Sequence, residues 1–208
     1  MKEVRNLAGQ TLIYGLGTII PRFLHYAVMT PFYTRIFYDS PSEYGIITEL
    51  YAWMVFLLVI LTYGMETGFF RFSQKNEDPE KVFATSLISL FVTSTMFVIL
   101  VNIFIRPVAD VMNYRNNHDY IRMFAGIVAV DAFSAIPFAK LRMEKKSAIF
   151  SSIKLINVIV TISLVVFLLK IAPGLWEKSN GWFREAYNPD YKVGYIFVAN
   201  LISSIVTL

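Results

Sequence analysis

The chain has 208 residues, of which 56% are hydrophobic and only 16% are charged, whereas about 25% of the residues of a soluble domain carry charge. A mean hydropathy of +0.53, together with 18 phenylalanines and 12 tyrosines, is typical of a protein that crosses a lipid bilayer. The absence of cysteine excludes disulfides, thiolate metal sites and cysteine nucleophiles, and the small net charge of +4 does not favour binding to nucleic acid.

Six apolar stretches approach the roughly 20 residues that a helix needs to cross a bilayer. In chain order they cover residues 7–37, 44–70, 82–105, 120–139, 148–169 and 193–208. The sequence therefore predicts an all-α membrane protein, a six-helix transmembrane bundle. The last stretch is still apolar at Leu208, so we expect the chain to be a fragment that forms one domain, the N-terminal transmembrane bundle of residues 1–208.

Basic residues in the short connections indicate the orientation of the bundle. The connection at residues 140–146 reads KLRMEKK and holds four lysines and arginines. Short cytoplasmic loops are enriched in these residues, so we expect this connection and the N-terminus to be cytoplasmic, with Lys154 on the same side.

The first stretch carries two ionisable side chains, Arg22 and His25, near its middle. At helical spacing, one stripe contains Gly15, Thr18, Arg22, His25 and Met29, with Tyr26 at its edge. A charge at mid-bilayer costs about 3 kcal/mol, so such residues usually face a bundle interior or a wet cavity. We expect Arg22, His25 and Tyr26 to line a substrate cavity in which the guanidinium binds phosphate or carboxylate. The alternatives are a structural ion pair of Arg22 with Asp131 or Glu49 and a packing role for His25.

Three carboxylates lie within or near the ends of predicted spans. Asp131 is central in the fourth span, while Glu49 and Glu66 lie near the two ends of the second. Because a carboxylate in the membrane can bind a proton or Na⁺, these three residues are candidates for ion coupling or for pairing with Arg22.

The second stretch ends in the segment LTYGMETGFFRF. Gly64 and Gly68 form a G-x-x-x-G step, which predicts the close approach of another helix. Glu66 and Arg71 flank the predicted cytoplasmic end. They are candidates for an ion pair at an inner gate, and surface anchoring is the alternative.

Soluble-enzyme chemistry has no support in the sequence. The two histidines, His25 and His118, do not have metal-ligand spacing, and no serine lies in a nucleophile elbow. We therefore expect a protein that is not an enzyme and needs no cofactor or metal.

The segments NLAGQTLIYGLGTIIPRFLHYAVMTPFYTRIF and EYGIITELYAWMVFLLVILTYGMETGFFRF resemble the N-terminal part of bacterial polysaccharide flippases of the O-antigen type. These belong to the superfamily that also holds lipid II flippases and multidrug and toxic-compound extrusion transporters. The resemblance is strongest over about residues 1–75 and implies a parent protein with about twelve to fourteen spans in two bundles around a cationic cavity.

The resemblance also implies a function. Such proteins move undecaprenyl-pyrophosphate-linked oligosaccharides from the inner to the outer leaflet of the bacterial inner membrane, for lipopolysaccharide and other cell-surface polysaccharides. Arg22 matches the arginines that meet the pyrophosphate. The implied partners are the lipid-linked oligosaccharide, membrane lipid, H⁺ or Na⁺ as coupling ion, and the missing C-terminal bundle.

Three other functions remain open. A multidrug or cation antiporter of the same fold would need acidic rather than basic cavity residues, which Arg22 disfavours. A non-catalytic membrane subunit would pair with another six-span chain. A membrane glycan ligase or acyltransferase is disfavoured, because the longest connection, residues 171–192, contains no histidine.

Overall fold

The computed structural model describes the backbone of residues 2–75, 78–179 and 181–208, and within these ranges the side chains of residues 15, 19–21 and 23–208. All regular secondary structure in the described residues is helical. The elements are α1 (Lys2–Ile36), α2 (Pro41–Thr62), α3 (Met65–Ser73), α4 (Pro79–Ile103), α5 (Ile105–Val111), α6 (His118–Met143), α7 (Ser147–Val166), a π-helical segment (Phe167–Ile171), α8 (Ala172–Lys178), α9 (Trp182–Ala186) and α10 (Lys192–Val206).

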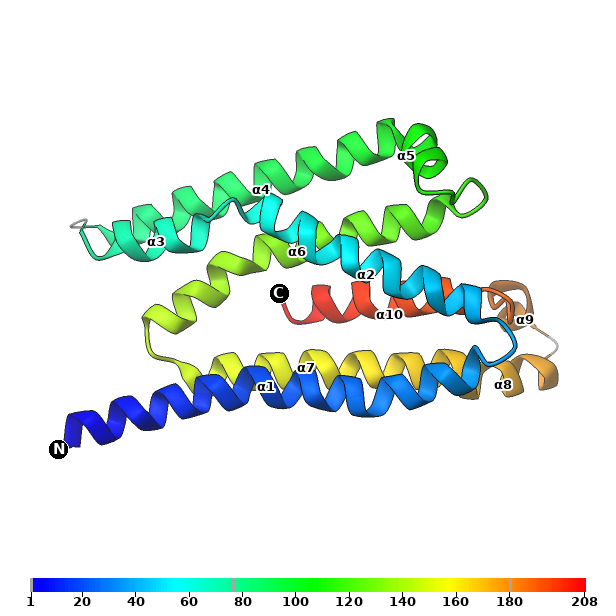
Figure 1. The fold of residues 1–208 in the computed structure, drawn as a ribbon, viewed down its shortest axis with the longest axis horizontal. Helices are drawn as coiled ribbons and strands as arrows, with labels where there is room; N and C mark the ends of the chain where they lie inside the picture. The colour runs from blue at the N-terminus through cyan, green and yellow to red at the C-terminus, as the bar shows by residue number, and fades with distance from the viewer. Residues whose placement is uncertain (1, 76–77, 180) are drawn as a thin grey trace.

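The long helices lie along one common axis. Helices α1, α4 and α7 run in one direction, and α2, α6 and α10 run in the other (Figure 1). Helix α6 is at the centre, because it packs against α2, α3, α4, α5, α7 and α10. Half of its most apolar window is buried, 50%, against 17–22% for the other long apolar helices. Helix α1 packs along α7.

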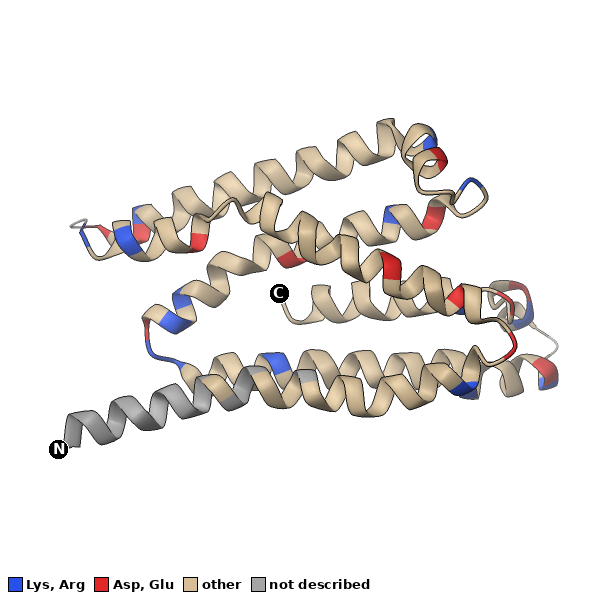
Figure 2. Ribbon diagram, viewed as in Figure 1, with Lys and Arg blue, Asp and Glu red and all other residues tan. Residues whose placement is uncertain are grey.

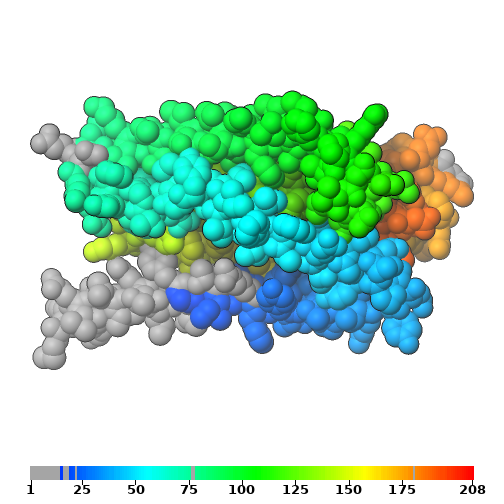
Figure 3. Space-filling model, turned by 45° about the horizontal axis from the view of Figure 1, so that its top comes forward, coloured from blue at the N-terminus to red at the C-terminus, as the bar shows by residue number. Residues whose placement is uncertain are grey.

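The outer surface of the bundle is apolar over the length of its helices. Figure 3 shows one face, which α2 and α4 cover, with α1 along its edge. Large apolar side chains of α4 point outward, among them Ile88, Phe91 and Ile103, while Ser86, Leu90 and Ser94 form its buried stripe. Small residues in such a stripe let helices pack closely in a membrane.

Most charged residues of the described part lie at the two ends of the bundle (Figure 2). Four segments are long and apolar enough to cross a membrane: Pro41–Ser73, Pro79–Ile103, His118–Met143 and Ser147–Lys178. These features are those of a multi-pass membrane protein. Four of the six predicted spans are thereby confirmed as membrane-crossing candidates.

The first and last predicted spans are not among these four membrane-crossing candidates. Helix α1 continues through Pro21 and Pro31, but many of its side chains lie outside the described residues. Helix α10 is apolar and has 15 residues, fewer than a helix needs to cross a typical bilayer.

The second predicted span is not one continuous helix. Tyr63 and Gly64 both have positive φ, 33° and 72°, and separate α2 from α3. Glycine adopts this backbone conformation without steric cost, which explains Gly64. The predicted G-x-x-x-G contact is wrong, because Gly64 lies outside a helix and a Cβ at Gly64 or Gly68 would meet no neighbour within 4 Å.

The π-helical segment before α8 has a local cause. Pro173, near the start of α8, has no N–H to donate to the preceding turn. The Tyr187 hydroxyl donates a hydrogen bond of 2.6 Å to the carbonyl oxygen of Leu168, inside the π-helical segment. The loop after α8 thus satisfies a backbone acceptor that the irregular helix leaves available.

Gly126 is the glycine at which two helices approach closely. A Cβ at this position of α6 would lie 3.4 Å from Leu201 Cδ1 of α10. We predict that Gly126→Leu separates α6 from α10 and lowers stability, since overpacking costs about 1–3 kcal/mol. Gly45→Leu is the matched control, because a Cβ there meets nothing within 4 Å and both variants gain the same helix propensity. Thermal unfolding followed by circular dichroism in detergent should give a lower midpoint for Gly126→Leu alone; equal midpoints would contradict the prediction.

Candidate functional site

Two adjoining pockets open within the bundle. The first, which we name the tyrosine pocket, has a volume of about 900 Å³ and is lined by α1, α2, α7 and α10, with Tyr26, Tyr33, Tyr44 and Tyr51 in its wall. The second, the charged pocket, has a volume of about 440 Å³ and is lined from α2, α3, α6, α7 and α10. Its charged residues are Glu66, Asp131, Arg142 and Lys154. The two pockets share Tyr51, Met54, Lys154, Asn157 and Asn200, so they adjoin along a common wall, and we refer to the two together as the hollow.

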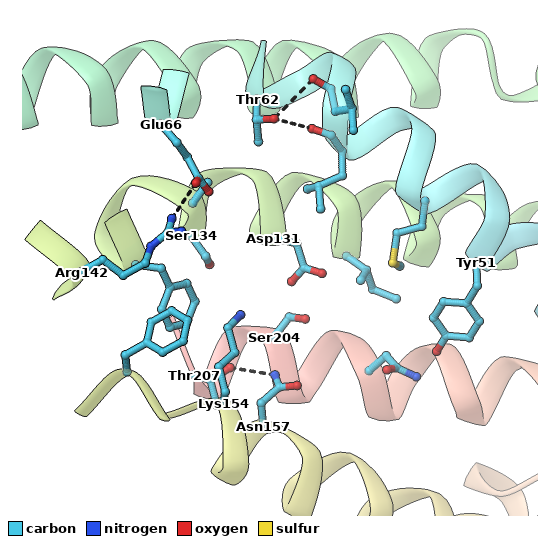
Figure 4. A pocket seen from close by; sticks show the side chains of 18 residues that line it. Tyr51, Thr62, Glu66, Asp131, Ser134, Arg142, Lys154, Asn157, Ser204 and Thr207 are labelled. Carbon is cyan, nitrogen blue, oxygen red and sulfur yellow. Dashed lines mark hydrogen bonds and ion pairs between the residues drawn. The ribbon is translucent and has the colours of Figure 1, made fainter. Parts of the chain in front are cut away.

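Asp131 lies in the middle of α6 and its carboxylate points into the charged pocket (Figure 4). The groups that interact with it electrostatically are the Ser204 hydroxyl of α10 and the Lys154 ammonium of α7. Lys154 Nζ also lies 3.9 Å from the centroid of the Phe138 ring. An acidic and a basic group from facing helices therefore lie within electrostatic range of each other in the span.

Polar side chains of α7 and α10 continue this surface. Asn157 Nδ2 donates to Thr207 Oγ1 at 2.9 Å, and Ser203 Oγ donates to the Asn157 carbonyl oxygen at 2.7 Å. Lys154 and Asn157 are three residues apart on α7, and Asn200 and Ser204 are four apart on α10. Such spacings place side chains on one helix face, so each helix presents a polar face to the hollow.

Glu66 is paired at one end of the charged pocket. Its Oε2 lies 2.6 Å from Arg142 Nη2 (Figure 4), and Arg142 also lies over the Phe70 ring. The predicted partner Arg71 is therefore wrong, because α3 presents Glu66 to the end of α6. Nearby, Lys140 pairs with Glu80 at 2.8 Å. The ion pairs hold α3 and α4 to α6 where the basic connection begins.

Glu49 lines neither pocket. It accepts a hydrogen bond of 2.6 Å from the hydroxyl of Tyr114, which ties α2 to the connection between α5 and α6. Burial, and next this hydrogen bond, raise the pKa of Tyr114 above its ordinary value, so the hydroxyl stays protonated at neutral pH and donates.

The stripe of the first span meets the tyrosine pocket in part. His25, Tyr26 and Met29 line the pocket, and the rings of His25 and Tyr26 lie edge to face with centroids 6.2 Å apart. Tyr26 is 70% exposed. The side chain of Arg22 lies outside the described residues, so its predicted cavity role and its alternative ion pair stay predictions.

Several lining residues were not predicted from the sequence, above all Lys154, which we had expected at the cytoplasmic side and which lines both pockets. Arg142, Asn157 and Asn200 were also missed. Helical spacing, which defines the polar stripe of the first span, also places the polar residues of the fifth span on one face and those of the sixth span on one face. The sequence therefore contains the pattern that predicts these lining residues. In the described part of the chain, no group of three or more His, Asp or Glu side chains is placed to hold a metal ion.

The bond between Tyr114 and Glu49 provides a test of the role of Glu49. We predict that Tyr114→Phe lowers the free energy of unfolding by about 1–3 kcal/mol, because it leaves a charged acceptor without its partner. Chemical denaturation in detergent measures this value. Tyr38→Phe, at a tyrosine that is 80% exposed, is the control and should leave it unchanged. A Tyr114→Phe protein as stable as the parent would show that the bond contributes nothing.

The interaction between Asp131 and Lys154 is testable with a double-mutant cycle. We predict that Asp131→Asn and Lys154→Met each destabilise the protein, and that the double variant loses less than the sum. Residues that interact directly give coupling energies of about 0.5–3 kcal/mol. Thermal or chemical unfolding of the four proteins measures the coupling, and strictly additive effects would rule out a direct interaction.

The comparisons with known proteins agree with the resemblance of the first two predicted spans to polysaccharide flippases. The family model described as polysaccharide biosynthesis protein matches residues 7–185, from α1 through most of α9. No curated protein and no solved structure matches the chain. The match covers well over half of the chain and includes the four segments that are long and apolar enough to cross a membrane, whereas α10, which also lines both pockets, lies outside it. This multi-pass membrane protein therefore belongs to the polysaccharide biosynthesis protein family, with a role in the synthesis or export of polysaccharide.

Proposed function

We propose that the chain forms the N-terminal bundle of a flippase, which moves undecaprenyl-pyrophosphate-linked oligosaccharides from the inner to the outer leaflet of the bacterial inner membrane. The N-terminus is cytoplasmic in this proposal. The observation that carries it is the pair of adjoining pockets within an apolar-surfaced bundle, with Lys154 in the wall of both. A lipid-linked saccharide needs such a wet route past the hydrocarbon for its polar part, while its tail stays in lipid.

The charge in the hollow suits a pyrophosphate. Lys154 contributes an ammonium to both pockets, and lysine is a common point-charge ligand of phosphate. Arg22, one turn from His25 on α1, is the second proposed ligand, with His25 and Tyr26 beside it. Asp131 balances Lys154 in the empty state, so the ammonium is not left as a lone charge within the membrane.

The mechanism requires no bond chemistry, so the protein is proposed not to be an enzyme. Transport follows from rocking of this bundle against a second one around a central site. Asp131 is the proposed coupling residue for H⁺ or Na⁺, because Glu66 is paired with Arg142 and Glu49 accepts from Tyr114. The second bundle, the lipid-linked substrate and membrane lipid are the proposed partners.

An antiporter for cationic drugs is the competing function. Its supporting observation is the presence of Glu66 and Asp131 in the charged pocket. Arg142 and Lys154 line the same pocket, however, so the acidic charge is matched by basic charge. The pocket therefore has no acidic excess with which to attract a cation.

Export of a surface polysaccharide tests the proposed function. We predict that Arg22→Ala or Lys154→Ala, in a strain whose only copy carries the change, lowers surface glycan at least tenfold at normal protein level. The lipid-linked precursor should accumulate, because its pyrophosphate loses a counter-charge in the cavity. Immunoblotting of surface glycan and chromatography of extracted lipids measure both effects.

Lys170→Ala is the matched control, since Lys170 is an exposed lysine that lines neither pocket. It should export normally. Wild-type export by both cavity variants would remove the anion-binding mechanism. Loss of cation efflux with normal glycan export would instead support the antiporter.

A further inference from the structure

Two buried tyrosine hydroxyls of the tyrosine pocket have no hydrogen-bond partner among the described residues. They belong to Tyr33 of α1 and Tyr51 of α2. Tyr33 is only 5% exposed. A buried polar group without a partner loses its hydrogen bonds to water without compensation, and buried tyrosine hydroxyls usually find a partner. Two unpaired hydroxyls in the wall of one pocket therefore point to a ligand that pairs with them.

Tyr33 and Tyr51 both line the tyrosine pocket, and they lie close enough to interact electrostatically. Their hydroxyl oxygens are themselves buried, so a ligand in the pocket reaches them by displacing the side chains that cover them. The ring of Tyr33 lies 6.2 Å from the ring of Tyr44, centroid to centroid, so two aromatic rings stand side by side in the wall. The hydroxyl of Tyr51 points from α2 toward α10 (Figure 4). Tyr51 also lines the charged pocket, so it lies at the boundary between the two pockets.

The chemistry of the wall indicates a neutral, polyhydroxylated ring. A tyrosine hydroxyl both donates and accepts a hydrogen bond, as do the hydroxyls of a sugar. Aromatic rings supply rigid amphipathic contact area for the C–H faces of such a ring. Asn157 and Asn200 add amide groups at the junction. A pocket of about 900 Å³ is within the usual range for small-molecule sites, about 300–1,000 Å³.

We propose that the tyrosine pocket is a subsite for the sugar ring next to the pyrophosphate, and that the hydroxyls of Tyr33 and Tyr51 bind hydroxyls of that ring. The inference rests on the proposed function, which supplies the lipid pyrophosphate that Lys154 would hold beside the sugar. Binding of a loaded carrier satisfies both tyrosines, whereas a sugar-free carrier leaves them unpaired. The pocket thus distinguishes loaded from empty lipid carrier.

A binding experiment tests the subsite with defined probes. The purified full chain, in nanodiscs of phosphatidylethanolamine and phosphatidylglycerol without glycoside detergent, is titrated with farnesyl pyrophosphate and with its glucosyl and N-acetylglucosaminyl conjugates. Isothermal titration calorimetry gives each Kd. We expect at least one conjugate to bind about tenfold more tightly than farnesyl pyrophosphate, and the double variant Tyr33→Phe, Tyr51→Phe to lose this preference while binding farnesyl pyrophosphate normally.

The stability of the variants separates a ligand role from a structural one. Because the two hydroxyls have no protein partner, their removal should leave the melting temperature unchanged or raise it. Tyr114→Phe is the control: it breaks a bond within the protein and should lower the melting temperature while keeping the preference for the sugar. A double variant that melts lower, or that keeps the preference, overturns the assignment of the two hydroxyls.

The outcomes also distinguish the subsite from the proposed function. Equal binding of all three probes by the parent protein, with loss of binding in Lys154→Ala, overturns the sugar subsite and leaves the flippase proposal standing. A sugar preference that depends on the two tyrosines, in a protein whose Lys154→Ala variant exports glycan normally, supports the subsite and counts against the charge mechanism. Absence of binding by every probe contradicts both.

Discussion

The cost of holding charge within a membrane-spanning bundle is the constraint on which this structure depends. Asp131 is in the middle of α6, and an ionised carboxylate there would cost about 3 kcal/mol on insertion scales if it faced lipid. The position of α6 removes that exposure, because six other helices pack around it. Ser204 and Lys154, from the facing helices α10 and α7, offset part of the remaining cost. A central helix thus makes a polar interior compatible with an apolar exterior.

The same arrangement explains why the polar interior is a hollow and not a packed core. Two of the ties between elements in the described part of the chain lie toward the ends of the bundle, where Glu66 pairs with Arg142 and Tyr114 donates to Glu49. Between them, α7 and α10 present amide and hydroxyl groups to α2 and α6. The break at Tyr63 and Gly64 contributes to this, because α3 starts there with a new orientation that carries Glu66 to the end of the charged pocket.

Features that depend on residues close together in the sequence could be predicted, whereas contacts between residues far apart in the sequence could not. Apolar length is a local property, so four of the six predicted spans coincide with segments long and apolar enough to cross a membrane. Helical spacing placed His25 and Tyr26 on or beside one face of the first span, and both residues line the tyrosine pocket. The partner of Glu66 was not, since Arg142 is 76 residues away and reaches it only through the packing of α3 on α6. Gly64 was misread because a pattern of glycines does not distinguish a helix contact from a turn with positive φ. Helical spacing groups Lys154 with Asn157 on one face of α7, but the residues of α6 and α10 that share a pocket with this face depend on how those helices pack.

On the proposed function, the two pockets divide recognition between charge and neutral hydrogen bonding, and this division has a consequence for specificity. Every saccharide linked to undecaprenyl pyrophosphate has the same pyrophosphate, so a counter-charge such as Lys154 would attract every such carrier, loaded or not. Discrimination is a difference of affinities and must come from groups that only one competitor satisfies. Unpaired hydroxyls meet this condition, since they favour a ligand with matching hydroxyls and penalise one without them. Because Tyr51, Asn157 and Asn200 line both pockets, the anion and the ring would contact one shared wall. On the proposed function, the pyrophosphate of the carrier and the sugar attached to it therefore bind side by side, so the site that binds the carrier also selects its loaded form.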